Sequence, residues 1–266
     1  KNVNRSPSMS DSAIRCRSAG RIRNFLRKRL LLAGWQAIFV LIAGLGLAVL
    51  VWTWLRLPET LSPVDRRRFS FRQITEGLGL VLADRQAVAY GLAAMLLLGA
   101  LYGFISSAQP VFGEAYGLNA LFALAMGATA VVQSASAFLC SRLLRRIGAA
   151  SVVGMALWAY VGFAAALVLA LTLNAVPFAL FFGLFTAMMA MFTWGDATLG
   201  ALSMANLGKV AGTAASAFGA LQALGATVLG TLIGQAYDGT PRALVWGSLL
   251  LGLAALGCVQ WARRQG

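Results

Sequence analysis

The chain has 266 residues, of which 59% are hydrophobic and 11% are charged. Soluble proteins average about 45–50% apolar and about 25% charged residues, so a soluble fold could not bury this much apolar surface. The chain has no histidine and only eight carboxylates, so the usual general acids, general bases and metal ligands are nearly absent. Composition therefore predicts an integral membrane protein without a metal or cofactor, and disfavours an enzyme.

The cysteines and the net charge agree with this interpretation. Cys16, Cys140 and Cys258 have no CxxC spacing and predict neither a disulfide framework nor a metal site. The formal net charge is +14, but the Lys and Arg residues lie between apolar runs and form no single basic surface. Nucleic acid is therefore not a predicted partner, and the charge is expected to set the orientation in a lipid bilayer.

Seven apolar runs are long enough to cross a bilayer, which takes about 20 helical residues. They cover residues 30–55, 87–108, 119–140, 150–173, 177–199, 212–236 and 243–261. The connections are mostly short, so neighbouring helices should be antiparallel. The expected fold class is all-α, a polytopic membrane protein with seven transmembrane helices.

Residues 1–29 precede the first run and carry nine Lys or Arg and one Asp. The composition of residues 15–29 is that of an organelle-targeting segment, rich in Arg and Ser and poor in acids. The preferred interpretation is a non-native or disordered stretch, the product of truncation, fusion or a frame change.

The connection at residues 56–85 has a helical pattern of its own. Ser70 and Gln73 have capping-box spacing, and apolar residues such as Leu78, Val81 and Leu82 follow at helical intervals. We expect residues 70–83 to form an amphipathic helix on the membrane surface, across the direction of the spans, with residues 66–68 facing anionic headgroups. The alternative is a solvated linker.

The distribution of positive charge predicts the topology. Connections on one side of the alternating helices carry 12 Lys or Arg and those on the other side carry one. By the positive-inside rule the richer side is cytoplasmic, which also places the C-terminus inside. The topogenic residues expected there are Arg66, Arg67, Arg68, Arg142, Arg145 and Arg146.

Several motifs follow one another in a specific order. The first span ends in WTWLRLPETL (52–61), Asp84-Arg85 precedes the second, EAYGL (114–118) follows it, and RLLRRIG (142–148) follows the third. The most specific stretch is VAGTAASAFGALQ (210–222), with DGTP (238–241) after it. Over residues 33–264, this order resembles the Bcr/CflA subfamily of drug-resistance major facilitator transporters.

The resemblance implies a twelve-helix, proton-coupled exporter of drug-like molecules in a bacterial inner membrane, of which helices six to twelve are present. The five front helices are missing, and with them the antiporter glycine motif and the acidic residues tied to proton coupling. The implied partners are a small-molecule substrate, protons, and a missing N-terminal half or a second copy; alone, the chain is expected to be inactive. The implied segments are 1–29, the sixth helix of the family (30–56), a cytoplasmic linker (57–85), the C-terminal six-helix bundle (86–262) and a cytoplasmic tail (263–266).

Candidate functional residues follow from the spans. Polar groups inside a span mark a cavity or an interhelical hydrogen bond, and Met-rich walls suit promiscuous sites. In the family, the second, third, fifth and sixth spans of this chain would line the substrate cavity. The cavity candidates are Ser106, Gln133, Ser134, Thr186, Met189, Thr193 and Gln222.

One carboxylate, Asp196, lies inside a predicted span, about one turn from the cytoplasmic end at residue 199. It is a candidate proton or charge site, and the alternative is a structural ion pair with Lys209 or Arg145. Small residues at intervals of four predict close helix packing. These are Gly99, Gly103, Gly208, Gly212, Gly219, Gly230 and Gly234.

Two other functions compete with transport. Seven spans would also allow a non-transporting protein, such as a receptor-like or assembly subunit. A membrane enzyme is disfavoured because GxSxG, P-loop and GxGxxG motifs are absent.

Overall fold

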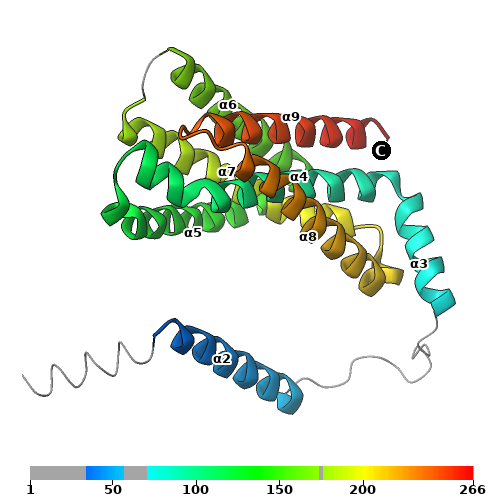
Figure 1. Ribbon diagram of the computed structural model, residues 1–266. Helices are drawn as coiled ribbons and strands as arrows, with labels where there is room; N and C mark the ends of the chain where they lie inside the picture. Colours follow the sequence, from blue (N-terminus) through cyan, green and yellow to red (C-terminus); the bar gives the residue numbers. More distant parts are fainter. Residues whose placement is uncertain (1–33, 57–70, 174–175, 266) are drawn as a thin grey trace, which may run out of the picture. The chain divides into compact units, whose positions relative to one another are not determined.

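The computed structural model describes residues 34–56, 71–173 and 176–265, which are mostly helical and contain no strand (Figure 1). The chain divides into two compact units, Lys1–Arg68 and Phe69–Gly266. The described part of the first unit is the helix α2, Gly34–Arg56. Large apolar side chains such as Phe39, Leu47 and Trp54 are exposed around it, as expected for a helix whose surroundings are lipid.

The second unit holds all the other described helices. They are α3 (Phe71–Ala83), α4 (Arg85–Pro110), α5 (Phe122–Ile147), α6 (Ala149–Leu173), α7 (Phe178–Met204), α8 (Ala211–Gln235) and α9 (Arg242–Gln265), with short π or 3-10 turns at Val111–Ala115, Asn119–Leu121 and Gly208–Val210. Within the described residues, seven helices are long enough and apolar enough to span a membrane, namely α2 and α4–α9. The predicted all-α polytopic fold is confirmed.

The helix predicted at residues 70–83 is present as α3, whereas its proposed cap Ser70 lies outside the described residues. Val81 is buried against Phe218 and Ala214 of α8, while Leu80 and Leu82 are exposed. The helix ends where the Asp84 carboxylate accepts hydrogen bonds from two backbone N–H groups of α4, both at 3.0 Å. From there α4 starts in a new direction (Figure 1). The location of α3 on a membrane surface stays a prediction.

Helix α4 lies at the centre of the second unit and packs against α7, α8 and α9, while α6 packs against α7 and α9. Aromatic residues fill the interior, with the rings of Phe104 and Phe185 4.5 Å apart between α4 and α7. The helices α5 and α8 are the least covered, with 11% and 22% of their spanning windows buried against 44–56% for α4, α6, α7 and α9. Each therefore has a long face without a partner in this unit.

The α4–α8 seam is built on glycines. A Cβ added to Gly230 of α8 would lie 2.8 Å from the carbonyl carbon of Tyr102 and 2.9 Å from the nitrogen of Gly103. Because these are backbone atoms, no side chain could move aside, so this approach requires glycine. Gly99 and Gly234 also lie at this seam, each against a side chain of the other helix. By contrast, Gly208, Gly212 and Gly219 have open space where a Cβ would be.

Candidate functional site

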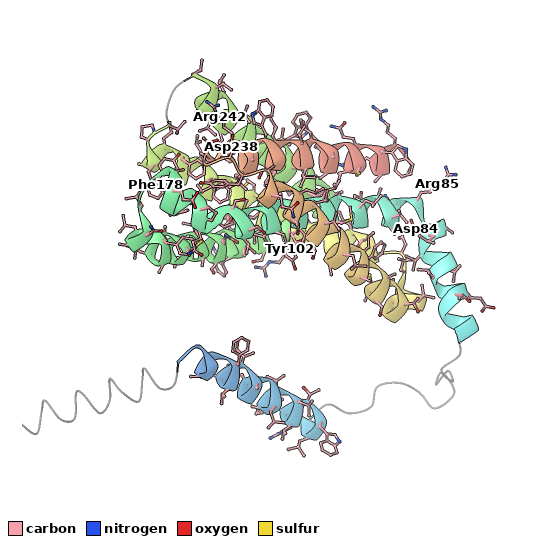
Figure 2. All side chains as sticks on the ribbon, viewed as in Figure 1. Asp84, Arg85, Tyr102, Phe178, Asp238 and Arg242 are labelled. Atoms are coloured by element: carbon pink, nitrogen blue, oxygen red, sulfur yellow. The ribbon has the colours of Figure 1, made fainter. Side chains whose placement is uncertain are left out.

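The six-helix bundle α4–α9 has two chemically different ends, marked in Figure 2 by Asp84 and Arg85 at one and by Phe178, Asp238 and Arg242 at the other. The first is the arginine-rich end, where α5 and α9 finish. Exposed basic side chains gather there, namely Arg142, Arg145, Arg146, Arg263 and Arg264. Arg66, Arg67 and Arg68 lie outside the described residues.

A direct contact fixes two helices together at this end. The Arg263 guanidinium of α9 donates to the backbone carbonyl of Ala150, at the start of α6. The absence of a side chain at Gly154 leaves room for this guanidinium. The contact is consistent with an antiparallel arrangement of α6 and α9.

Side-chain hydrogen bonds join α5 to α7 along the line where the two helices meet, which we call the α5–α7 seam. The Thr193 hydroxyl of α7 donates a hydrogen bond to Oε1 of Gln133 on α5, at 3.3 Å. Close by, Nε1 of Trp194 donates to the hydroxyl and carbonyl oxygens of Ser136, at 2.6 and 2.9 Å. The seam is therefore joined by side-chain hydrogen bonds inside the apolar part of the bundle.

Five residues of α7 fall on one face of the helix, because they are spaced by alternating steps of three and four. We name this face the α7 stripe. Its members are Thr186, Met189, Thr193, Asp196 and Gly200. Four of them are residues predicted from the sequence, and Gln133 joins the stripe through Thr193.

The stripe runs from a closed part to a more open part. Thr186 and Met189 are buried, whereas Thr193, Asp196 and Gly200 are partly exposed. The hydroxyl of Thr186 has no hydrogen-bond partner among the residues that the structure describes. A buried polar atom without a partner is costly and calls for a physical explanation.

Asp196 lies farther from the end of its helix than the predicted span limit at residue 199 suggests, and its depth in a membrane stays a prediction. Helix α7 continues to Met204, eight residues beyond Asp196, so the carboxylate lies about 12 Å along the helix from its end. Within the described residues it makes no hydrogen bond and no ion pair; the predicted alternative partner Arg145 is exposed elsewhere, and the Lys209 side chain lies outside the described part. Asp196 is thus a carboxylate on a candidate membrane-spanning helix, without a partner in the described chain.

The other cavity candidates do not join the stripe. Ser134 is exposed and its hydroxyl donates to the carbonyl of Ala130 within α5, at 2.8 Å. Ser106 lies beside Gly234, at the α4–α8 seam. Gln222 is partly buried on α8. Sequence reasoning missed Ser136, although its position three residues after Gln133 on the same helix could have indicated it.

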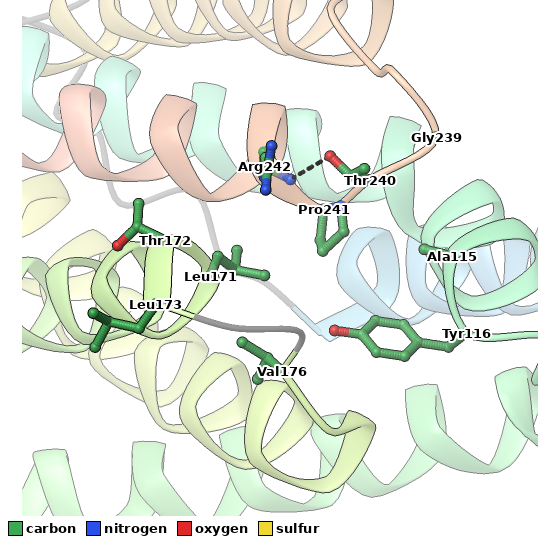
Figure 3. A pocket seen from close by; sticks show the side chains of 10 residues that line it. All are labelled: Ala115, Tyr116, Leu171, Thr172, Leu173, Val176, Gly239, Thr240, Pro241 and Arg242. Carbon is green, nitrogen blue, oxygen red and sulfur yellow. Dashed lines mark hydrogen bonds between the residues drawn. The ribbon is translucent and has the colours of Figure 1, made fainter.

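A separate cavity of about 490 Å³ opens at the end of the bundle opposite the arginine-rich end (Figure 3). Tyr116, Thr240 and Arg242 give it polar lining, and the Thr240 hydroxyl accepts a hydrogen bond from the Arg242 backbone N–H at 3.4 Å. Burial raises the pKa of the Tyr116 phenol above its ordinary value. Among the described residues, no group of three or more Cys, Asp or Glu side chains could hold a metal ion.

A comparison with protein-family models decides the class of this chain. The model of the Major Facilitator Superfamily matches residues 30–230, well over half of the 266 residues. The chain belongs to the Major Facilitator Superfamily. Comparisons with curated proteins and with solved structures each found no match.

Membership in the Major Facilitator Superfamily gives the polar seam a functional context. Proteins of this superfamily are membrane transporters, not enzymes, and the receptor-like alternative is not favoured. A transporter of this kind moves its substrate between two helical bundles around a central site. In a major facilitator bundle, the polar groups of the α7 stripe are therefore the first candidates for substrate contact.

Proposed function

We propose that this major facilitator chain takes part in the proton-coupled export of small drug-like molecules. The single observation that carries the proposal is the α7 stripe with Gln133, where polar and soft side chains interrupt an otherwise apolar bundle. Polar side chains inside a membrane are costly and mark substrate or ion pathways. The ordered Bcr/CflA-like motifs of the sequence support export as the direction.

The stripe is also well placed for a broad range of substrates. Met189 is flexible and polarizable, and the neighbouring rings of Phe185 and Phe192 are buried on the same side of the core. Threonine and glutamine side chains can donate and accept hydrogen bonds. Such a wall suits apolar molecules that carry one or two polar groups.

A complete cavity would need a second bundle. The faces of α5 and α8 that have no partner in the second unit are the surfaces against which it would pack. We propose that this bundle comes either from a five-helix front that joins α2 or from a second copy of the chain. We further propose a bacterial inner-membrane location with the arginine-rich end in the cytoplasm, which the charge distribution supports.

The test is drug efflux in a bacterial strain that lacks its own exporters. One culture expresses the chain as it stands, and another a version preceded by a complete five-helix front from a Bcr/CflA transporter. We expect resistance and proton-dependent dye extrusion with the second version only. Equal performance of the short chain would contradict the need for a front half, and inactivity of both would contradict drug export.

Orientation has its own test. Single cysteines placed beside Arg142 and Arg146, in a chain whose native cysteines are replaced, should resist impermeant thiol reagents added to intact cells. A cysteine at Gly239, in the exposed turn between α8 and α9, is the matched control and should react. The reverse pattern would overturn the proposed orientation.

A further inference from the structure

We propose that the cavity opposite the arginine-rich end binds a phospholipid, whose phosphate group is recognised by Arg242 and Tyr116. The cavity lies between the end of α6, the start of α9 and the turn that follows α4 (Figure 3). None of its described lining residues belongs to the α7 stripe. The site is therefore separate from the candidate substrate site and does not depend on drug export.

The charge of the lining favours an anion. Among the lining residues that the structure describes, Arg242 has the one charged side chain, and this side chain is exposed. The acidic residues closest to the lining in sequence, Glu114 and Asp238, do not line the cavity. The Asp238 carboxylate accepts hydrogen bonds from the Thr240 backbone N–H and hydroxyl, at 3.1 and 2.6 Å. These bonds are the main reason that the pKa of Asp238 is lowered, and Arg242 contributes least to that lowering. The Arg242 guanidinium is therefore available to a negatively charged ligand.

Tyr116 supplies a second hydrogen-bond donor from another wall of the cavity. Its ring is held by Phe178 and Phe181 of α7, with ring centroids 5.4 and 5.5 Å away. Its side chain extends into the cavity toward Pro241, the residue before Arg242 (Figure 3). No described residue forms a hydrogen bond with its hydroxyl, so the phenol can donate to a ligand. A phosphate group has several acceptor oxygens and can accept from the guanidinium and the phenol together.

Apolar surface continues from the cavity along two neighbouring helices. On α9, Trp246 and Leu250 follow Arg242 at intervals of four, so the three residues share one exposed face. On α6, which packs against α9, Leu169 and Leu173 are exposed at the end that borders the cavity. Tryptophan is enriched where a membrane meets water, at the level of the lipid headgroups. The polar cavity and the apolar faces beside it thus match the headgroup and the hydrocarbon chains of a phospholipid.

The lining itself favours an amphiphilic ligand over a small soluble ion. Leu171, Val176 and Pro241 give the cavity apolar walls next to Arg242 and Tyr116. A free phosphate ion would gain nothing from these walls, whereas the glycerol and first chain carbons of a phospholipid would be removed from water there. The volume of about 490 Å³ lies within the range of about 300–1,000 Å³ that is typical of ligand pockets. The cavity therefore has room for a headgroup.

The test is photocrosslinking of the full chain in vesicles of phosphatidylglycerol that contain a minor fraction of dioleoylglycerol, a lipid without phosphate. Thr172 is exposed and lines the cavity, so Thr172→p-benzoylphenylalanine places the crosslinker at the site. The matched control is Val228→p-benzoylphenylalanine, on an exposed part of α8 away from the cavity. Mass spectrometry gives the ratio of the two lipid adducts, corrected for the vesicle composition. We expect at least a fivefold preference for phosphatidylglycerol at position 172 and a ratio within twofold of unity at position 228.

Two sets of variants connect the preference to the residues. Arg242→Gln should abolish the preference at position 172, whereas Arg242→Lys keeps the charge and should retain most of it. Tyr116→Phe keeps the ring contacts but removes the donor, and should lower the preference at least twofold. An unchanged crosslinking yield at position 228 in each variant shows that the bundle is still folded.

Three outcomes would overturn the proposal. They are no preference at position 172, the same preference at position 228, and a preference that survives Arg242→Gln. An excess of inorganic phosphate in the buffer should not compete with the lipid. If it removed the preference, the cavity would be a site for a soluble anion, and the assignment to a phospholipid would be wrong.

Discussion

The α4–α8 and α5–α7 seams join helices of similar length by different physical means. Between α4 and α8, Gly230 brings two backbones together, and close packing makes the contact at this point. Between α5 and α7, the Gln133–Thr193 and Trp194–Ser136 hydrogen bonds hold the helices. Lipid provides no hydrophobic force between helices, so packing and hydrogen bonds are the available means.

The difference separates a structural contact from a functional one. A backbone contact through glycine tolerates no added atom and cannot be exchanged for a ligand contact. A hydrogen-bonded contact can release its polar groups to a substrate, since a hydroxyl or amide can change partner. The predictions below test whether the two seams differ in this way.

The largest effect is expected at the glycine contact. Gly230→Ala places a Cβ against the backbone of α4 and should destabilise the bundle by about 2–3 kcal/mol, in the range of overpacked cores. Gly219→Ala, on the same helix with open space beside it, should be neutral or stabilising by up to about 1 kcal/mol. Thermal unfolding in detergent micelles measures both. Equal effects would show that the seam is not tightly packed.

The next effect is expected at Trp194. Trp194→Phe keeps an aromatic ring but removes the donor to both oxygens of Ser136, so we expect a loss of about 1–2 kcal/mol. Trp158 on α6 is 61% exposed and offers the matched control, with an expected change within about 0.5 kcal/mol for Trp158→Phe. If the two variants unfold alike, the hydrogen bonds do not stabilise the seam.

A smaller effect is expected for the Gln133–Thr193 pair. A double-mutant cycle of Gln133→Leu and Thr193→Val should give a coupling energy of about 0.6 kcal/mol, the average for hydrogen bonds between membrane helices. The four unfolding free energies of the cycle supply the measurement. A coupling energy of zero would mean that these side chains do not interact in the folded protein.

The smallest effect is expected where the α4–α8 seam leaves the membrane. The Tyr237 phenol donates to the carbonyl of Pro110 at 3.0 Å, and Tyr237→Phe should cost about 0.5 kcal/mol. Burial, followed by the negative charges of Glu114 and Asp238, raises the pKa of Tyr237. The contribution of this phenol to stability is therefore complete below its ordinary pKa of about 10 and falls as pH rises through the higher folded value. Unfolding measured from pH 8 to 11 should show less alkaline loss for Tyr237→Phe than for the unaltered chain.

The sequence predicted the spans because apolar length determines them, but it placed several helix ends too early. Arg142 and Arg145 interrupt the apolar run after residue 140, yet α5 continues to Ile147. Charged residues can extend a helix beyond the hydrocarbon, and hydropathy does not detect that extension. The same error shortened α7 and placed Asp196 too close to its end.

Spacing could group site residues but could not orient them. The intervals between Thr186, Met189, Thr193 and Asp196 place them on one face, whereas the partner Gln133 lies 60 residues from Thr193 and was identified only by the fold. Glycine spacing was equally ambiguous. Gly230 and Gly234 meet α4, while Gly208 and Gly212 have the same interval and open space beside them.

The most direct test of the account asks which face of α7 meets water. In a chain whose native cysteines are replaced, Gly200→Cys probes the α7 stripe, and Thr198→Cys probes the buried face two residues away. Reaction with a small, charged thiol reagent is measured in reconstituted membranes that are open to both sides. We predict that Gly200→Cys reacts at least tenfold faster than Thr198→Cys. Equal rates, or faster reaction at Thr198→Cys, would contradict the account in which the α7 stripe becomes the more open face of α7 at Gly200.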